Sequence, residues 1–142
     1  MKSTNEAADA QLDRHVAYAL LRAIIGVNLA VHGISRLLAG PHAFAASLVG
    51  MFHATFLPAW SLMAFGLVLP WIEAALGLLI LFGAATRYAL IAASLTILVL
   101  TFGSCLRQDW ESAGLQLIYA AIYSALLAFR RENAYSIDAT RG

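Results

Sequence analysis

Four long apolar runs constrain this chain more than any other feature. They cover residues 16–38, 61–82, 87–106 and 112–129, and each is long enough to cross a hydrocarbon core of roughly 30 Å as an α-helix. The 142 residues are 61% hydrophobic and only 12% charged, which is far from the composition of soluble domains. The sequence therefore predicts an all-α, integral membrane four-helix bundle that forms one domain over residues 1–142.

The charged residues predict the topology. Residues 1–15 are expected to form an exposed tail, because they are acidic where a cleaved signal peptide would be basic. With four spans, both termini lie on one side. That side carries six of the basic residues: Lys2, Arg14, Arg87, Arg130, Arg131 and Arg141. The other side carries Arg36 and Arg107, so the positive-inside rule places both termini in the cytoplasm.

The connection at residues 40–59 is the one long loop of this topology. Its apolar residues recur at helical spacing and predict a short helix on the outer membrane surface. Trp60 and Trp110 fall where an outer aromatic belt is expected.

The first run has one polar face. At 100° per residue, Arg22, Asn28, His32 and Arg36 fall within about a third of the helix circumference. Lipid offers no hydrogen bonds, so this face is expected to point into the bundle or toward a partner. Simpler roles stay open, because Arg22 and Arg36 could each snorkel to headgroups and Asn28 could serve only as interhelical glue.

Glu73 is the only acidic residue in any of the four runs, and it needs a partner or a proton there. Antiparallel helix rise places it level with Asn28, so Arg22 or Asn28 is expected to reach it directly and His32 through water. Residues on nearly the same face would allow another helix to approach closely: Gly66, Pro70 and Gly77. A titratable His32 and Glu73 suit proton transfer, with a purely structural pair as the alternative.

The fourth run places Gln116, Tyr119 and Tyr123 on one face. These side chains have hydrogen-bonding capacity, although Gln116 could be interhelical glue and the tyrosines could be packing residues. The hydroxyls of the third run commonly bond their own backbone, so we expect that run to be structural.

The residue inventory argues against several cofactors. Only His32 among the histidines lies within a run, so no haem held between two histidines is expected. No metal site and no nucleotide-binding loop is predicted, and Cys105 alone cannot form a CxxC pair. Nucleic acid is not an expected partner.

A lipid-soluble quinone fits the polar core best, because its oxygens need hydrogen-bond donors and its reduction takes up protons. In this hypothesis His32 and Glu73 are the catalytic residues that handle protons. The cofactor-binding residues are Arg22, Asn28, Arg36, Gln116 and Tyr119.

Several segments together resemble the DoxX/DoxD family. They are Leu21–Gly26, His32–Leu37, Trp71–Gly77 and Tyr135–Asp138, in an arrangement that covers nearly the whole chain. The family usually has lysine in place of Arg36 and leucine in place of Ile137. The resemblance implies a four-helix membrane protein whose matching polar residues are Arg22, His32, Arg36 and Glu73. Named members form the membrane part of thiosulfate:quinone oxidoreductase and terminal quinol oxidase assemblies, and others are similar to assembly or maturation factors.

The expected function is therefore a quinone-interacting component of an oxidoreductase in a bacterial or archaeal cytoplasmic membrane. Thiosulfate:quinone oxidoreductase is one type of enzyme that fits this expectation. Arg36 and Arg107 near the outer mouth would attract a small anion such as thiosulfate. Nearby acidic residues would weaken this attraction. The alternative is a non-catalytic scaffold, assembly or maturation factor for a partner protein; a transporter is less favoured. Beyond the lipid bilayer, the expected partner is a membrane or periplasmic subunit or a second copy of the chain.

Overall fold

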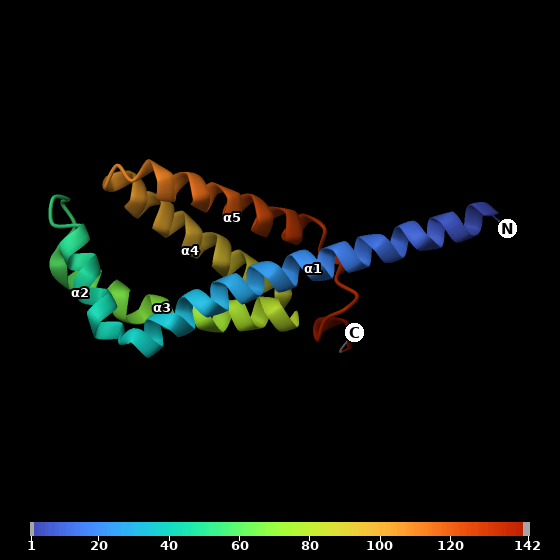
Figure 1. Ribbon diagram of the computed structural model, residues 1–142, viewed down its shortest axis with the longest axis horizontal. Helices are drawn as coiled ribbons and strands as arrows, with labels where there is room; N and C mark the ends of the chain where they lie inside the picture. Colours follow the sequence, from blue (N-terminus) through green and yellow to red (C-terminus); the bar gives the residue numbers. More distant parts are fainter. Residues whose placement is uncertain (1, 141–142) are drawn as a thin grey trace.

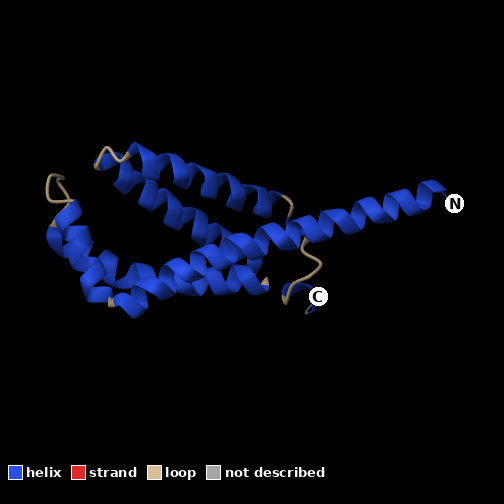
Figure 2. Ribbon diagram, viewed as in Figure 1, coloured by secondary structure: helices blue, strands red, loops and turns tan. Residues whose placement is uncertain are grey.

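Five α-helices dominate the computed structural model of this protein, which describes residues 2–140, with side chains from residue 5 onward (Figures 1 and 2). They are α1 (Lys2–Ala39), α2 (Pro41–Met51), α3 (Ala59–Phe82), α4 (Thr86–Leu106) and α5 (Trp110–Ala128). Two short 3₁₀ helices follow, at Arg130–Glu132 and Asp138–Thr140, and there is no strand within residues 2–140. Helices α1, α3, α4 and α5 are long and apolar enough to cross a membrane, which confirms the prediction of an all-helical chain with four long apolar helices.

Helix α1 is longer than its apolar run. Its first third projects beyond the other helices (Figure 1), and residues 5–14 are exposed. Residues 5–14 of the predicted tail are therefore exposed but helical, because this segment contains good helix formers and neither glycine nor proline.

Helices α1 and α3 pack very closely, because glycines on both helices leave room for the backbone of the other helix. A Cβ atom at Gly26 would lie 2.6 Å from the backbone nitrogen of Leu81. A Cβ atom at Gly33 would collide with the backbone of Ala74, and one at Gly77 with Ala30. The predicted close approach of another helix to the face of Gly77 is confirmed, and it is made by α1.

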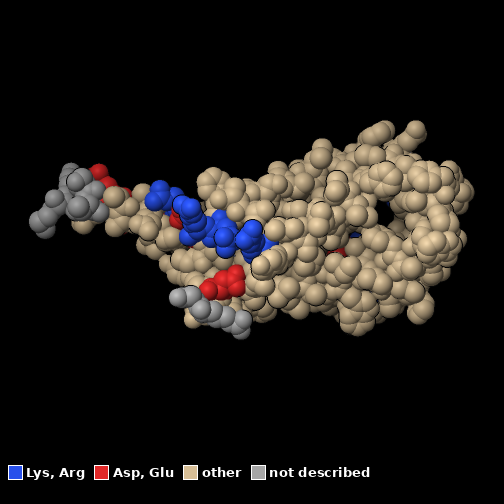
Figure 3. All heavy atoms as spheres, turned by 180° about the vertical axis from the view of Figure 1, so that it is seen from behind, with Lys and Arg blue, Asp and Glu red and all other residues tan. Residues whose placement is uncertain are grey.

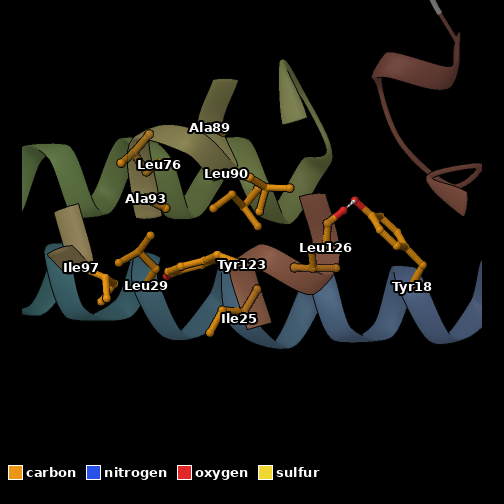
Figure 4. Packing of buried hydrophobic residues seen from close by; sticks show 11 residues of the cluster. Tyr18, Ile25, Leu29, Leu76, Ala89, Leu90, Ala93, Ile97, Tyr123 and Leu126 are labelled. Carbon is orange, nitrogen blue, oxygen red and sulfur yellow. Dashed lines mark hydrogen bonds between the residues drawn. The ribbon is translucent and has the colours of Figure 1, made fainter. Parts of the chain in front are cut away.

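Packing of α4 and α5 against this pair closes the core. Figure 4 shows the buried cluster, to which four helices contribute. Tyr123 of α5 is 1% exposed, Leu90 of α4 and Ile80 of α3 are fully buried, and Ile25 is the α1 contribution. The Tyr18 hydroxyl donates to the Leu126 carbonyl oxygen at 2.9 Å, so a polar group at the edge of the cluster is satisfied.

Helix α2 confirms the short helix predicted in the long loop, and it packs along the first half of α3 (Figure 1). Ala45 is fully buried and meets Gly66, at which a Cβ atom would lie 2.6 Å from the Ala45 Cα atom. Pro70 lies inside α3 and removes one helical hydrogen bond there. Together α2 and the first half of α3 form an arch beside α4.

The chain end folds back onto the α3–α4 turn. The Asp138 carboxylate accepts hydrogen bonds of 2.7 Å from the backbone nitrogens of Ala85 and Thr86, so it caps α4 from a distant part of the sequence. The Ile137 nitrogen donates to the Phe82 carbonyl oxygen at 3.1 Å.

The α4–α5 connection carries a local cap instead. Asp109 accepts a hydrogen bond of 3.1 Å from the Ser112 nitrogen and one of 2.8 Å from the Ser112 hydroxyl. These hydrogen bonds hold the pKa of the Asp109 carboxyl below its usual value, with Arg107 adding to the effect.

Candidate functional site

An ion pair between α1 and α3 is the centre of the candidate site. Arg36 donates to the Glu73 carboxylate through Nη1, and the Glu73 side chain is 4% exposed while that of Arg36 is 30% exposed. The guanidinium also lies over the ring of Phe44, with 4.6 Å between the Arg36 Cζ atom and the ring centroid. Arg36 therefore ties the first helix to both α2 and α3.

The predicted contact of Arg22 or Asn28 with Glu73 is wrong, because the helices pack in a different register. The contacts of Gly26 with Leu81, and of Gly33 with Ala74, place Glu73 level with residue 34. That position is about 9 Å further along α1 than Asn28. The glycines set the register, so they decide which arginine meets the carboxylate.

Arg22 binds carbonyl groups rather than a carboxylate. Its Nη1 donates at 2.9 Å to the carbonyl oxygens of Ile80 and Leu81, and its Nη2 donates at 2.6 Å to that of Tyr135. The side chain is 5% exposed, so it does not snorkel. Arg22 joins the end of α3 to the segment that follows α5. Because it does not reach Glu73, the structure gives no support to its predicted role in cofactor binding.

A cavity of about 130 Å³ brings the other predicted residues together. It is lined by all of the predicted site residues except Arg22: Asn28, His32, Arg36, Glu73, Gln116 and Tyr119. Tyr123 and Thr96 also line it. Three separate helix faces that the sequence marks as polar therefore meet in one place.

His32 occupies the outer edge of this cavity. Its side chain is exposed, and its Nδ1 atom lies 2.9 Å from the carbonyl oxygen of Asn28 on the same helix. The cavity therefore reaches the surface of the bundle at His32. A water-mediated contact between His32 and Glu73 stays a prediction.

A second cavity of about 450 Å³ adjoins the first, and both are lined by Arg36, Leu100 and Gln116. It lies under the arch of α2 and α3, and its walls are mainly apolar: Phe44, Leu48, Leu62, Phe65, Val99 and Phe102. Figure 3 shows an opening in the surface near the α2 end, with small basic and acidic areas on its inner side. A mainly apolar cavity of this volume with a few polar groups is typical of small-molecule sites.

Two arginines flank the larger cavity in similar surroundings. Arg36 lies over Phe44, and Arg107 lies over the ring of Phe52 with 5.4 Å between Cζ and the centroid. Arg107 also pairs with Asp109 at 3.6 Å. The sequence predicted a surface helix from the apolar residues of the 40–59 connection, which include Phe44 and Phe52, and did not show that these two rings form a cavity wall. Only the packing of this connection on the other helices brings them there.

Gln116 lies where the two cavities meet. Its Nε2 atom donates to the Ser104 hydroxyl at 3.0 Å. Its Oε1 atom is buried and has no hydrogen-bond partner among residues 5–140. The Nε atom of Arg22 and the Oδ1 atom of Asn133 are buried in the same way without a partner among these residues, so the unpaired atom by itself does not mark a ligand site.

Within residues 5–140, no three His, Cys, Asp or Glu side chains are grouped to hold a metal ion. No protein-family model, curated protein or solved structure matches this chain. The candidate site therefore stands on its geometry alone.

Proposed function

We propose that this chain is a multi-pass protein of the bacterial or archaeal cytoplasmic membrane, of DoxX/DoxD type, that binds a quinone as a component of an oxidoreductase. One observation carries the proposal: a buried carboxylate–arginine pair lies where a polar cavity joins a larger apolar cavity. An amphiphilic ring ligand requires such a combination of surfaces.

The surface of the bundle supports the membrane location. Large apolar side chains are exposed on several helices, including Ile24 at 67%, Leu98 at 64% and Leu117 at 63%. Water would penalise so much exposed apolar surface, whereas lipid would not. The exposed Trp60 and Trp110 begin α3 and α5 at the same end and fit an interfacial aromatic belt.

Basic residues support the orientation with both termini in the cytoplasm. They gather where α1 leaves the bundle (Figure 3), at the end that holds the start of α4 and the chain after α5. In a Cys105→Ala background, Ala54→Cys is expected to react with a membrane-impermeant thiol reagent on intact cells. Ala134→Cys is expected to react only after permeabilisation, and the reverse pattern would contradict the orientation.

A quinone fits the residues present. The larger cavity has the size and apolar walls for a substituted ring, and Arg36 and Gln116 lie at the end that adjoins the smaller cavity. A bound quinone would supply two-electron chemistry coupled to the uptake of two protons. Arg36 would donate hydrogen bonds to it, while Glu73 holds the guanidinium in place and provides a carboxylate for proton transfer. His32 lines the same cavity as Glu73 and would exchange protons with it there.

The test is the quinone content of the protein extracted in its native lipid with a styrene–maleic acid polymer. Wild type is expected to carry close to one quinone per chain. His32→Ala and Glu73→Gln are each expected to bind quinone about tenfold more weakly, since each loses a hydrogen-bonding or charged group at the site. Ser124→Ala, an exposed position on α5 outside both cavities, is the control. Wild type without quinone would contradict the proposal.

The second candidate is a non-catalytic scaffold, assembly or maturation factor, and the projecting first third of α1 favours it. This exposed helix is free to contact another protein outside the bundle. The same native-lipid preparation separates the two functions. A stoichiometric protein partner without quinone would support the scaffold, whereas bound quinone would support redox work.

A further inference from the structure

A groove between α1 and the end of α5 lies apart from the candidate site. Its volume is about 250 Å³. Its walls are mainly apolar side chains: Ala17, Tyr18, Leu21, Ala125, Leu126 and Phe129. The Tyr18 hydroxyl already donates to the Leu126 carbonyl oxygen, so the one polar side chain of these walls is satisfied. Leu21 is 36% and Phe129 is 65% exposed, so this α1–α5 groove opens on the surface of the bundle and suits a hydrocarbon chain.

The α1–α5 groove runs from the membrane interface into the hydrocarbon region of the proposed membrane. Arg14 lines its rim and lies two residues before the first apolar run. From Arg14 to Leu21 the helix rises about 10 Å, whereas half of a hydrocarbon core measures roughly 15 Å. In the proposed orientation this half is the cytoplasmic leaflet. An acyl chain in the groove would therefore have its headgroup at the level of Arg14.

Positive charge gathers at this rim, where α1 leaves the bundle (Figure 3). Arg14 lines the groove, and Arg130 interacts electrostatically with Tyr18 of its wall. Arg131 is the next residue, and both Arg130 and Arg131 are exposed. Neither of these two arginines forms an ion pair within residues 5–140. They are therefore free to bind an anion at the rim.

Acidic residues do not cancel the positive charge of the rim. Glu132 is the one acidic residue that lines the groove, and its carboxylate lies 3.2 Å from the His15 Nδ1 atom and 4.0 Å from the Arg14 Nε atom. Three more acidic residues of α1 are centred roughly 90° around the helix from the wall residues: Glu6, Asp9 and Asp13. Three arginines against one carboxylate leave the rim with an excess of positive charge.

We propose that the α1–α5 groove binds an anionic phospholipid of the cytoplasmic leaflet, with an acyl chain along the apolar walls and the phosphate among Arg14, Arg130 and Arg131. Basic pockets between membrane helices on the cytoplasmic side are typical sites for anionic headgroups, and arginine pairs well with phosphate. A phospholipid with a choline headgroup would fill the same groove but gain less, because its own positive charge opposes the arginines. The inference rests on the proposed membrane location and orientation, and it is independent of the quinone site.

The experiment is native mass spectrometry of delipidated protein in mild detergent, with an equimolar mixture of dioleoylphosphatidylglycerol and dioleoylphosphatidylcholine. The two lipids have the same chains and differ in headgroup charge. Wild type is expected to form its first lipid adduct with the glycerol lipid at least about tenfold more often, because several arginines act on one phosphate. Arg14→Gln/Arg130→Gln/Arg131→Gln is expected to bring the two adducts within about twofold. The matched control replaces the same three arginines with lysine, which keeps the charge and most of the preference.

Ala17→Trp tests the part of the site that holds the chain. The indole would fill the α1–α5 groove, so the adducts of both lipids are expected to fall by about fivefold or more. Ala121→Trp, at an exposed position of α5 outside the groove, is the control and is expected to keep the wild-type adducts.

Equal adducts of both lipids on wild type would overturn the lipid site. So would a preference that survives in the glutamine variant, or wild-type adducts on Ala17→Trp. Recovery of wild type from the soluble fraction of cells would instead contradict the proposed membrane location. A preparation without quinone would contradict the proposed redox function and leave the lipid site standing.

Discussion

Replacing Arg36 with alanine is expected to destabilise the protein by about 3 kcal/mol or more, because it leaves the Glu73 carboxylate buried without its cation. The Glu73 residue is 3% exposed, so solvent cannot take over the role of the guanidinium. The variant also loses the contact of the guanidinium with the Phe44 ring, which weakens the attachment of α2.

The measurement is the free energy of unfolding in mild detergent at neutral pH, with a double variant as control. Arg36→Met/Glu73→Leu removes both charges and keeps apolar volume, so its stability is expected to lie within about 1 kcal/mol of wild type. Its quinone binding is nevertheless expected to be lost. If Arg36→Ala unfolded at the wild-type free energy, the pair would be structurally unimportant.

A single methyl group at Gly33 is the other substitution with a large expected effect. The Cβ atom of Gly33→Ala would collide with the backbone of Ala74 and of Pro70, neither of which can move without shifting α3. Overpacking of this kind costs about 1–3 kcal/mol, and the upper part of that range is expected where backbone atoms are the obstacle. Separation of α1 from α3 would also pull Arg36 away from Glu73.

Gly114→Ala is the matched control for this prediction. Gly114 lies inside α5, where a Cβ atom would meet nothing within 4 Å. Alanine is the better helix former, so this variant is expected to be stabilised by up to about 1 kcal/mol. Thermal unfolding of both variants should therefore shift in opposite directions. Equal shifts would show that the α1–α3 contact is looser than the glycine positions indicate.

Much of the candidate site follows from helical periodicity. Asn28, His32 and Arg36 share a face of α1, Gln116 and Tyr119 share a face of α5, and each face lines the smaller cavity. Polar side chains on otherwise apolar helices find hydrogen-bond partners inside the bundle and not in lipid. Their convergence could therefore be predicted without knowing how the helices pack. Arg22 shares the α1 face as well, but it lies too far along the helix to take part.

Interhelical register could not be predicted in the same way. A sequence shows the ends of an apolar run only to within a few residues, and each residue moves a contact by about 1.5 Å. The contacts of three glycines decide the register: Gly26, Gly33 and Gly77. In this register Glu73 meets Arg36 and not the expected Arg22. The partner of Arg22 was equally hidden, because the chain end returns across more than a hundred residues to meet it.

The sequence by itself determined an all-helical chain with four long apolar helices and polar faces, since apolar length and 3.6-residue periodicity are local properties. Only the tertiary structure decided that α2 and the first half of α3 arch over a cavity and that Arg36 meets Glu73. Cavities and unpaired atoms arise from the fit between distant surfaces. That fit depends on how closely the backbones approach at a few small residues; the local pattern shows these residues but not which residues of another helix they meet.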